Sequence, residues 1–220
     1  MLKWWKIAGI VLVLYALVAG LLLPVPNLPI LEQSIRNLYY HVPMWFGMLA
    51  LLLASGYHSV KMLSTKDISC DRKAVSYASV AVLYGCIGLA TGMLWAKNTW
   101  GVYWTNDPKL NSAAIGMLMY AAYFVLRNSI EDEEKRARIS AVYNLFVLPV
   151  YIVLIYIMPR LTASLHPGNG GNPGFNSYDL DSRLRLVFYP AVLGWVFLGF
   201  WIADLQIRIK QIAFKKSLIE

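Results

Sequence analysis

Residues 1–24 read MLKWWKIAGIVLVLYALVAGLLLP, a charged start followed by a long apolar run. A membrane-spanning helix needs about 20 predominantly apolar residues, because each residue advances the helix by only about 1.5 Å. The run is long enough to cross a bilayer, and no small-residue cleavage site follows it. We therefore expect an uncleaved first membrane span.

Five further apolar stretches follow along the 220 residues. The predicted spans are residues 4–23, 41–60, 75–95, 111–127, 141–158 and 185–206. The charged fraction is 15%, against about 25% in a soluble domain, and the charges cluster between the apolar runs. The sequence therefore predicts an all-α, polytopic integral membrane protein with six transmembrane helices, forming one domain over residues 1–220.

The basic residues divide unequally between the two sides of this predicted bundle. If the N-terminus is cytoplasmic, fourteen of the 20 Lys and Arg residues fall in cytoplasmic segments and six on the opposite, outer side. Cytoplasmic loops are enriched in Lys and Arg, so the division predicts that both termini lie inside the cell (N-in/C-in). The net charge of +8 then reflects membrane orientation, and we expect no nucleic-acid site.

The three histidines separate by depth. His41, in LYYHVPMWFG, and His166, in ASLHPGNG, lie on the outer side, whereas His58 follows His41 by 17 positions, about 25 Å along the same helix. Two outer imidazoles on different elements can ligate haem iron from opposite faces. The alternative is that His41 orients a helix end and His166 is a solvated loop residue. A zinc site is disfavoured, because a third outer histidine or cysteine is absent.

The predicted outer loop 96–110 and the residue before it are rich in aromatic side chains. Those within ten positions of one another are Trp95, Trp100, Tyr103 and Trp104. Aromatic residues are common at membrane–water interfaces, so an interfacial belt is one interpretation. The other is a platform of flat rings that binds a hydrophobic ligand. Composition alone leaves both open.

Residues 100–110, WGVYWTNDPKL, resemble the tryptophan-rich WWD signature, W-G-x-W-W-x-W-D-x-R-L-T, of the haem-handling proteins of cytochrome c biogenesis. YHVP at 40–43 and LHPG at 165–168 stand where that family places its two outer histidines. Six spans and 220 residues are most similar to its haem exporter C (CcmC) branch. The matching positions are Trp100, Gly101, Trp104, Asp107 and Leu110, and the departures are Tyr103, Asn106, Lys109 and Asn111.

The resemblance implies that haem b binds at the outer face, with His41 and His166 as axial ligands of the iron. The haem-contacting residues that it implies are Trp95, Trp100, Gly101, Tyr103, Trp104, Asp107 and Lys109. Lys109 occupies the basic position of the motif and is the first choice among the outer cations for a haem propionate.

The resemblance also implies a place in a larger assembly. The chain would lie in the cytoplasmic (inner) membrane of a bacterium, with its site facing the periplasm, and would deliver haem to a membrane-anchored haem chaperone, the E component. The other implied partners are the ATP-binding cassette subunits A and B and a small single-span D component. No G-x-x-x-x-G-K-[ST] loop is present, so we expect a transport subunit rather than an enzyme, with ATP hydrolysis left to partners.

Three other functions compete with haem delivery. A bis-histidine membrane cytochrome acting in electron transfer would need paired histidines at two depths, and only His58 lies on the inner side. A permease that carries haem through the bilayer is disfavoured, because ionisable residues such as Asp204 lie near span ends. The synthetases of the same family that attach haem are larger, so length argues against them.

The predicted orientation can be tested by cysteine labelling. A cysteine introduced at position 170 should react with a membrane-impermeant maleimide from the outer side. Labelling of position 170 from the cytoplasmic side alone would contradict the topology and with it the outer location of both histidines.

Overall fold

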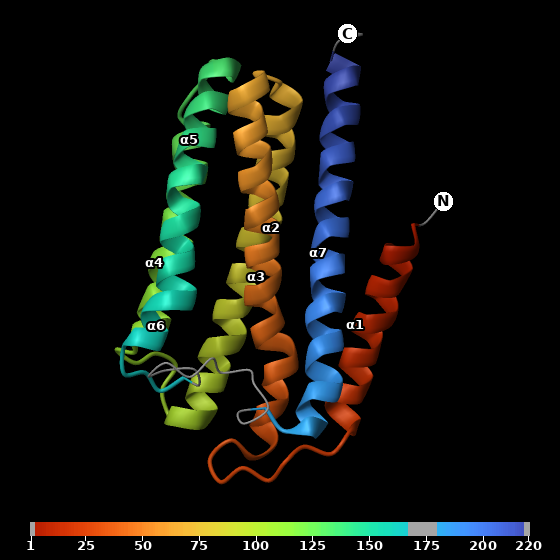
Figure 1. Cartoon of the computed structure of the whole chain (residues 1–220), viewed down its shortest axis with the longest axis vertical. Coiled ribbons are helices and arrows are strands. Elements are labelled where there is room, and N and C mark those ends of the chain that lie inside the picture. The colour runs from red at the N-terminus through yellow and green to blue at the C-terminus, as the bar shows by residue number, and fades with distance from the viewer. Residues whose placement is uncertain (1–2, 167–179, 218–220) are drawn as a thin grey trace.

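The computed structural model describes residues 3–166 and 180–217. In these residues the secondary structure is helical without a strand, and six helices are long and apolar enough to cross a membrane (Figure 1). The predicted all-α, six-span fold is confirmed. The start of α2 (Leu38–Thr65) and the short α6 (Met158–Leu161) lie at the lower end of the bundle in Figure 1. His41 is in the first turn of α2 and His166 follows α6, so this end is hereafter the histidine end.

The first span matches its predicted bounds to within one residue, and the other five are longer than predicted. The elements are α1 (Trp4–Leu22), the 3-10 helix η1 (Glu32–Asn37), α2 (Leu38–Thr65), α3 (Ile68–Trp100), α4 (Pro108–Asn128), α5 (Glu133–Ile152), the π-helical turn η2 (Val153–Ile157), α6 (Met158–Leu161) and α7 (Ser182–Ser217). η1 runs directly into α2, and η2 and α6 continue α5 toward the histidine end.

The predicted loop 96–110 is corrected by the structure. α3 continues to Trp100, so Trp95 and Trp100 are helical residues, and the connection to α4 is only residues 101–107. Gly101 ends α3 in the left-handed conformation (φ 78°), which glycine adopts without steric cost. Asp107 caps α4, and Pro108, which lacks an N–H, suits the first turn. The helix ends are thus set by the local sequence.

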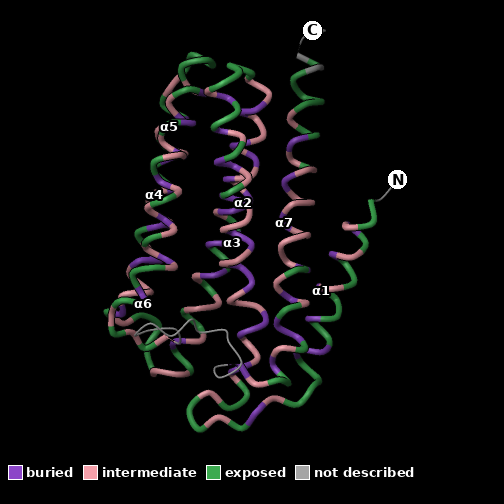
Figure 2. Tube along the Cα trace, in the orientation of Figure 1, coloured by how far each residue is buried: buried purple, intermediate pink, exposed green. Residues whose placement is uncertain are grey.

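The main core forms around α2 and α3, against which α4, α5 and α7 pack, and Figure 2 shows the buried positions along these helices. Met48, Leu51 and Tyr84 are among its fully or almost fully buried residues. The Tyr84 hydroxyl donates to the Trp195 carbonyl oxygen at 2.8 Å, which joins α3 to α7. Large apolar side chains such as Leu118 are exposed on the outer faces, as expected of helices surrounded by lipid.

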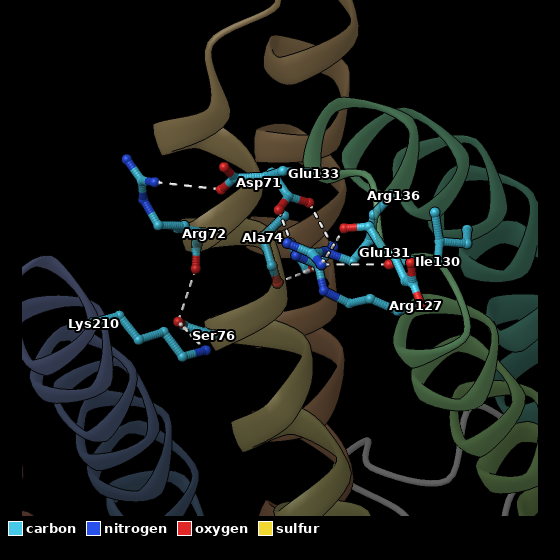
Figure 3. A network of polar contacts seen from close by, with 11 residues as sticks. Asp71, Arg72, Ala74, Ser76, Arg127, Ile130, Glu131, Glu133, Arg136 and Lys210 are labelled. Carbon is cyan, nitrogen blue, oxygen red and sulfur yellow. Dashed lines mark hydrogen bonds and ion pairs between the residues drawn. The ribbon is translucent and has the colours of Figure 1, made fainter. Parts of the chain in front are cut away.

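A buried ion pair ties the helices together at the end opposite the histidines (Figure 3). The Arg127 guanidinium of α4 donates to both carboxylate oxygens of Asp71 of α3, at 2.7 and 2.5 Å. On the same turns of α3, Ser76 accepts a hydrogen bond of 3.1 Å from Lys210 of α7. Asp71 is 3% exposed and Arg127 9%, so each charge depends on its partner.

Breaking this pair should destabilise the bundle. Replacing Arg127 by Met leaves Asp71 buried without its partner and should cost about 3–5 kcal/mol, whereas the double variant Arg127→Met/Asp71→Leu should recover much of the loss. Thermal unfolding in detergent measures both. The control is Glu133→Gln, because Glu133 is half exposed and lies 3.7 Å from Arg72, so its loss should cost under about 1 kcal/mol. Equal losses in the single and double variants would contradict the role of the pair.

Candidate functional site

His41 lies in the first turns of α2 and faces α3. Its Nδ1 atom is 2.9 Å from the Gly88 carbonyl oxygen and 3.2 Å from the Thr91 hydroxyl. A carbonyl oxygen can only accept, so Nδ1 carries the proton and donates to Gly88. In this tautomer the lone pair of the neutral ring is on Nε2, the nitrogen that can bind a metal.

The position of the His41 ring depends on a glycine and two tryptophans. A Cβ atom at Gly92 would lie 2.7 Å from His41 Cε1, so a larger residue there would displace the ring. The ring centroids of Trp45 and Trp95 lie 6.3 and 5.9 Å from that of His41, both edge-on. Tight packing from α2 and α3 therefore fixes the imidazole in one orientation.

His166 follows α6 and packs against the start of α4 and the end of α3. Its Nδ1 atom is 3.0 Å from Asp107 Oδ1, and the Trp100 ring lies edge-on to it at 5.1 Å between centroids. Its side chain is only 21% exposed, so the interpretation of His166 as a solvated loop residue is wrong. Since an ionised carboxylate only accepts, Nδ1 carries the proton, and the neutral ring has its lone pair on Nε2.

The charges around His166 favour its neutral form. The pKa of His166 is lowered to about 4, mainly by burial and also by the nearby Lys109 ammonium, whereas Asp107 acts in the opposite direction. Burial alone would raise the pKa of Asp107, but hydrogen bonds from Leu165 and Ser164 and the proximity of His166 hold it below its ordinary value. At neutral pH the pair is thus a neutral imidazole donating to a carboxylate.

The structure brings both predicted ligands to one end of the bundle. His41, His166 and Lys109 lie close enough to interact electrostatically with one another, although they come from α2, the segment after α6, and α4. The arrangement offers two neutral imidazoles, each with Nδ1 bound to an acceptor, and an ammonium group beside them. Such a donor set can ligate iron axially and pair with a carboxylate of the same ligand.

The predicted aromatic residues divide into two groups. Trp95 and Trp100 contact the histidines, as described above. Tyr103 and Trp104, 51% and 37% exposed, lie on the surface of the short loop. The Trp104 indole N–H donates to Asn111 Oδ1 at 3.3 Å, and Lys97 lies 5.6 Å from the Tyr103 ring centroid. The loop therefore presents apolar rings at the histidine end.

Sequence reasoning missed the α3 residues that hold His41. Gly88, Thr91 and Gly92 lie on the turns of α3 that face α2. The signal was available, because two glycines four positions apart on a spanning helix indicate close approach of a neighbouring helix. Which side chain fills that space depends on the pairing of α2 with α3, which the spacing does not give.

Six helices long and apolar enough to span a membrane define the protein as a polytopic membrane protein, with two histidines at one end of the bundle. A family model described as heme exporter protein C (CcmC) matches residues 1–217. The chain therefore belongs to the heme exporter protein C family, and the resemblance inferred from the WWD-like loop is confirmed.

Two heme exporter C relatives have low sequence identity to this chain but match most of its length. Heme exporter protein C of Bradyrhizobium diazoefficiens is 28% identical over 181 residues, which are 80% of this chain and 67% of that protein. The protein of the same name from Rhodobacter capsulatus is 26% identical over 178 residues, 77% of this chain and 69% of that protein. Cytochrome c biogenesis protein CcsA of a Synechococcus species is 33% identical over 100 residues, but these are only 44% of this chain and 33% of that protein.

The electrostatics of His166 give a testable pH dependence. In protein labelled with ¹⁵N-histidine, the His166 ring should titrate near pH 4 rather than near its ordinary 6.5, so stability should fall as pH is lowered from 6.5 toward 4. Lys109→Met should raise the pKa of His166, because it removes a nearby positive charge. The control Lys97→Met removes an ammonium that bonds to the Gly101 carbonyl oxygen and should leave the titration unchanged. A His166 pKa near 6.5 in the wild type would contradict the buried, neutral imidazole.

Proposed function

We propose that this chain handles haem for the biogenesis of c-type cytochromes. It binds haem b between His41 and His166 at the outer face of the bacterial inner membrane, and then delivers it to a haem chaperone. The observation that carries the proposal is the pair of imidazoles at one end of the bundle, each held with its proton on Nδ1. Membership of the heme exporter protein C family supports the choice of haem over another metal-containing ligand.

The donor set fits a haem iron. Iron in haem takes two axial ligands, and neutral imidazole is a common one. The two rings come from different elements, so they can approach a planar ligand from different sides. Trp95 and Trp100, which lie against these rings, add apolar surface for the macrocycle. Haem supplies the iron that both histidines bind, and the protein supplies orientation and exclusion of water.

Lys109 is the cation best placed for a haem propionate. It acts electrostatically on both histidines, and its side chain is partly buried. Two other cations at the histidine end are engaged elsewhere: Arg36 donates to the Gly20 and Leu23 carbonyl oxygens, and Arg183 pairs with Asp181. Substitution of lysine for the arginine of the usual motif keeps the charge and gives up bidentate hydrogen bonding.

Delivery requires that a partner can reach one edge of the bound haem. The loop 101–107 is the part of the site best suited to leave that edge exposed. Val102, Tyr103 and Trp104 are 46%, 51% and 37% exposed, and together they form an apolar surface next to the histidines. In this proposal one edge of the haem lies at this surface, and the chaperone, the E component, binds there. The A, B and D components would complete the assembly and supply ATP hydrolysis, with both termini of this chain in the cytoplasm and the site in the periplasm. The subunit itself performs no chemical reaction.

The alternative, a membrane cytochrome, lacks a comparable inner site. His58 stacks on Tyr77 with 5.6 Å between ring centroids and an interplanar angle of 6°. It lies on α2 seventeen positions from His41, and the sequence contains no further histidine to pair with it. Transmembrane electron transfer between two bis-histidine haems therefore has no support in this chain.

Histidine variants test the proposed function. His41→Ala and His166→Ala should each weaken haem binding and convert the spectrum of the purified protein from low-spin to high-spin, since one axial position is vacated. Some haem should remain, because its apolar faces stay buried against the tryptophans. Added imidazole should partly restore the low-spin spectrum in both variants.

The control is His58→Ala, which removes a histidine of the same chain from the opposite end of the bundle. Its haem content and spectrum should match the wild type. An altered spectrum in His58→Ala together with an unchanged one in His166→Ala would overturn the outer site and favour the cytochrome.

A further inference from the structure

Asp107 makes more hydrogen bonds than the end of a helix requires. Its Oδ1 atom accepts from the backbone N–H of Lys109 at 2.9 Å, from that of Leu110 at 3.3 Å, and from His166 Nδ1 at 3.0 Å. Its Oδ2 atom accepts from the Ser164 hydroxyl at 2.9 Å and from the Leu165 backbone N–H at 2.8 Å. The residue is 3% exposed, so these bonds are shielded from water.

The two oxygens serve different elements. Oδ1 caps α4 and contacts the imidazole, whereas Oδ2 holds the backbone of the segment that carries His166. Another capping aspartate in this chain does less: Asp132 at the start of α5 accepts from the Lys135 N–H at 2.7 Å. Capping α4 therefore accounts for one oxygen of Asp107 and leaves the contacts with residues 164–166 to be explained.

We propose that Asp107 is a positioning residue for His166, acting through the imidazole rather than by touching haem. The carboxylate fixes the proton on Nδ1 and directs Nε2 to the ligand side, and its Oδ2 bonds hold the segment 164–166 at the right distance from α4. This inference rests on the proposed function, in which His166 binds the iron.

The chemistry of the contact predicts how the bound iron is affected. A carboxylate that accepts from Nδ1–H increases the electron donation of the imidazole through Nε2, which strengthens its bond to a metal. A stronger donor stabilises ferric more than ferrous iron and thus lowers the reduction potential of a bound haem. His41 donates to a neutral carbonyl oxygen instead, so the two axial ligands are unequal, and His166 is the stronger donor.

Asp107→Asn separates positioning from capping. Asparagine caps helices as well as aspartate does, so the start of α4 should be preserved. Its amide has a single acceptor atom, so the contacts of Oδ1 and Oδ2 cannot both be kept. We expect haem affinity to fall by about 10- to 100-fold and the reduction potential of the remaining haem to become more positive.

The matched control is Asp132→Asn, the same change at the N-cap of α5, and it should alter neither quantity. Ser164→Ala is a second variant that leaves both the carboxylate and the imidazole in place. It removes one donor to Oδ2, so it should shift affinity in the same direction by a smaller amount.

A measurement on the haem-free protein keeps this inference distinct from the proposed function. The ¹⁵N shifts of the His166 ring should report a proton on Nδ1 in the wild type and a mixture of tautomers in Asp107→Asn. Unchanged ring shifts in that variant would show that Asp107 acts only as the N-cap of α4, and would overturn the inference. If instead the shifts change as expected while His166→Ala leaves the haem spectrum intact, the positioning role stands and the assignment of His166 as an iron ligand fails.

Discussion

A lipid bilayer offers no hydrogen-bonding partner to a peptide group, and this constraint organises the rest of the molecule. The six long helices satisfy their own backbone through the hydrocarbon region, and residues outside helices are confined to the ends of the bundle. Side chains that must be oriented by loops therefore cluster at those ends. The histidine site lies at one end and the Asp71–Arg127 pair near the other, with an apolar core between them.

The sequence predicted what depends on composition and spacing along single helices. The six spans follow from apolar run length, and the depth of His41 relative to His58 follows from helical rise. The end of α3 was placed five residues too early, because Lys97, Asn98 and Thr99 are polar enough to suggest a loop. They remain helical since the first residue that favours the left-handed conformation is Gly101.

Contacts between elements were beyond sequence reasoning. That His41 donates to Gly88, and that Gly92 leaves space for its ring, depends on the register of α2 against α3. Asp107 and His166 are 59 positions apart in sequence, and their contact depends on the position at which the chain leaves α6. Asp107 was predicted to contact haem as part of the motif. The motif singled out the residue, but a motif gives no information on which neighbour a carboxylate faces.

The two histidines are held in physically different ways. His41 is fixed between two packed helices, by a backbone carbonyl and a glycine, so its ring can move only if α2 and α3 separate. His166 belongs to a connecting segment attached to the bundle through the hydrogen bonds of Asp107. Hydrogen bonds of this kind each contribute only about 1–3 kcal/mol net, so they can exchange without repacking the core. In the proposed function the two axial ligands would therefore be supported unequally. The packing of α2 against α3 would hold His41, and the hydrogen bonds of Asp107 would hold His166, the stronger donor.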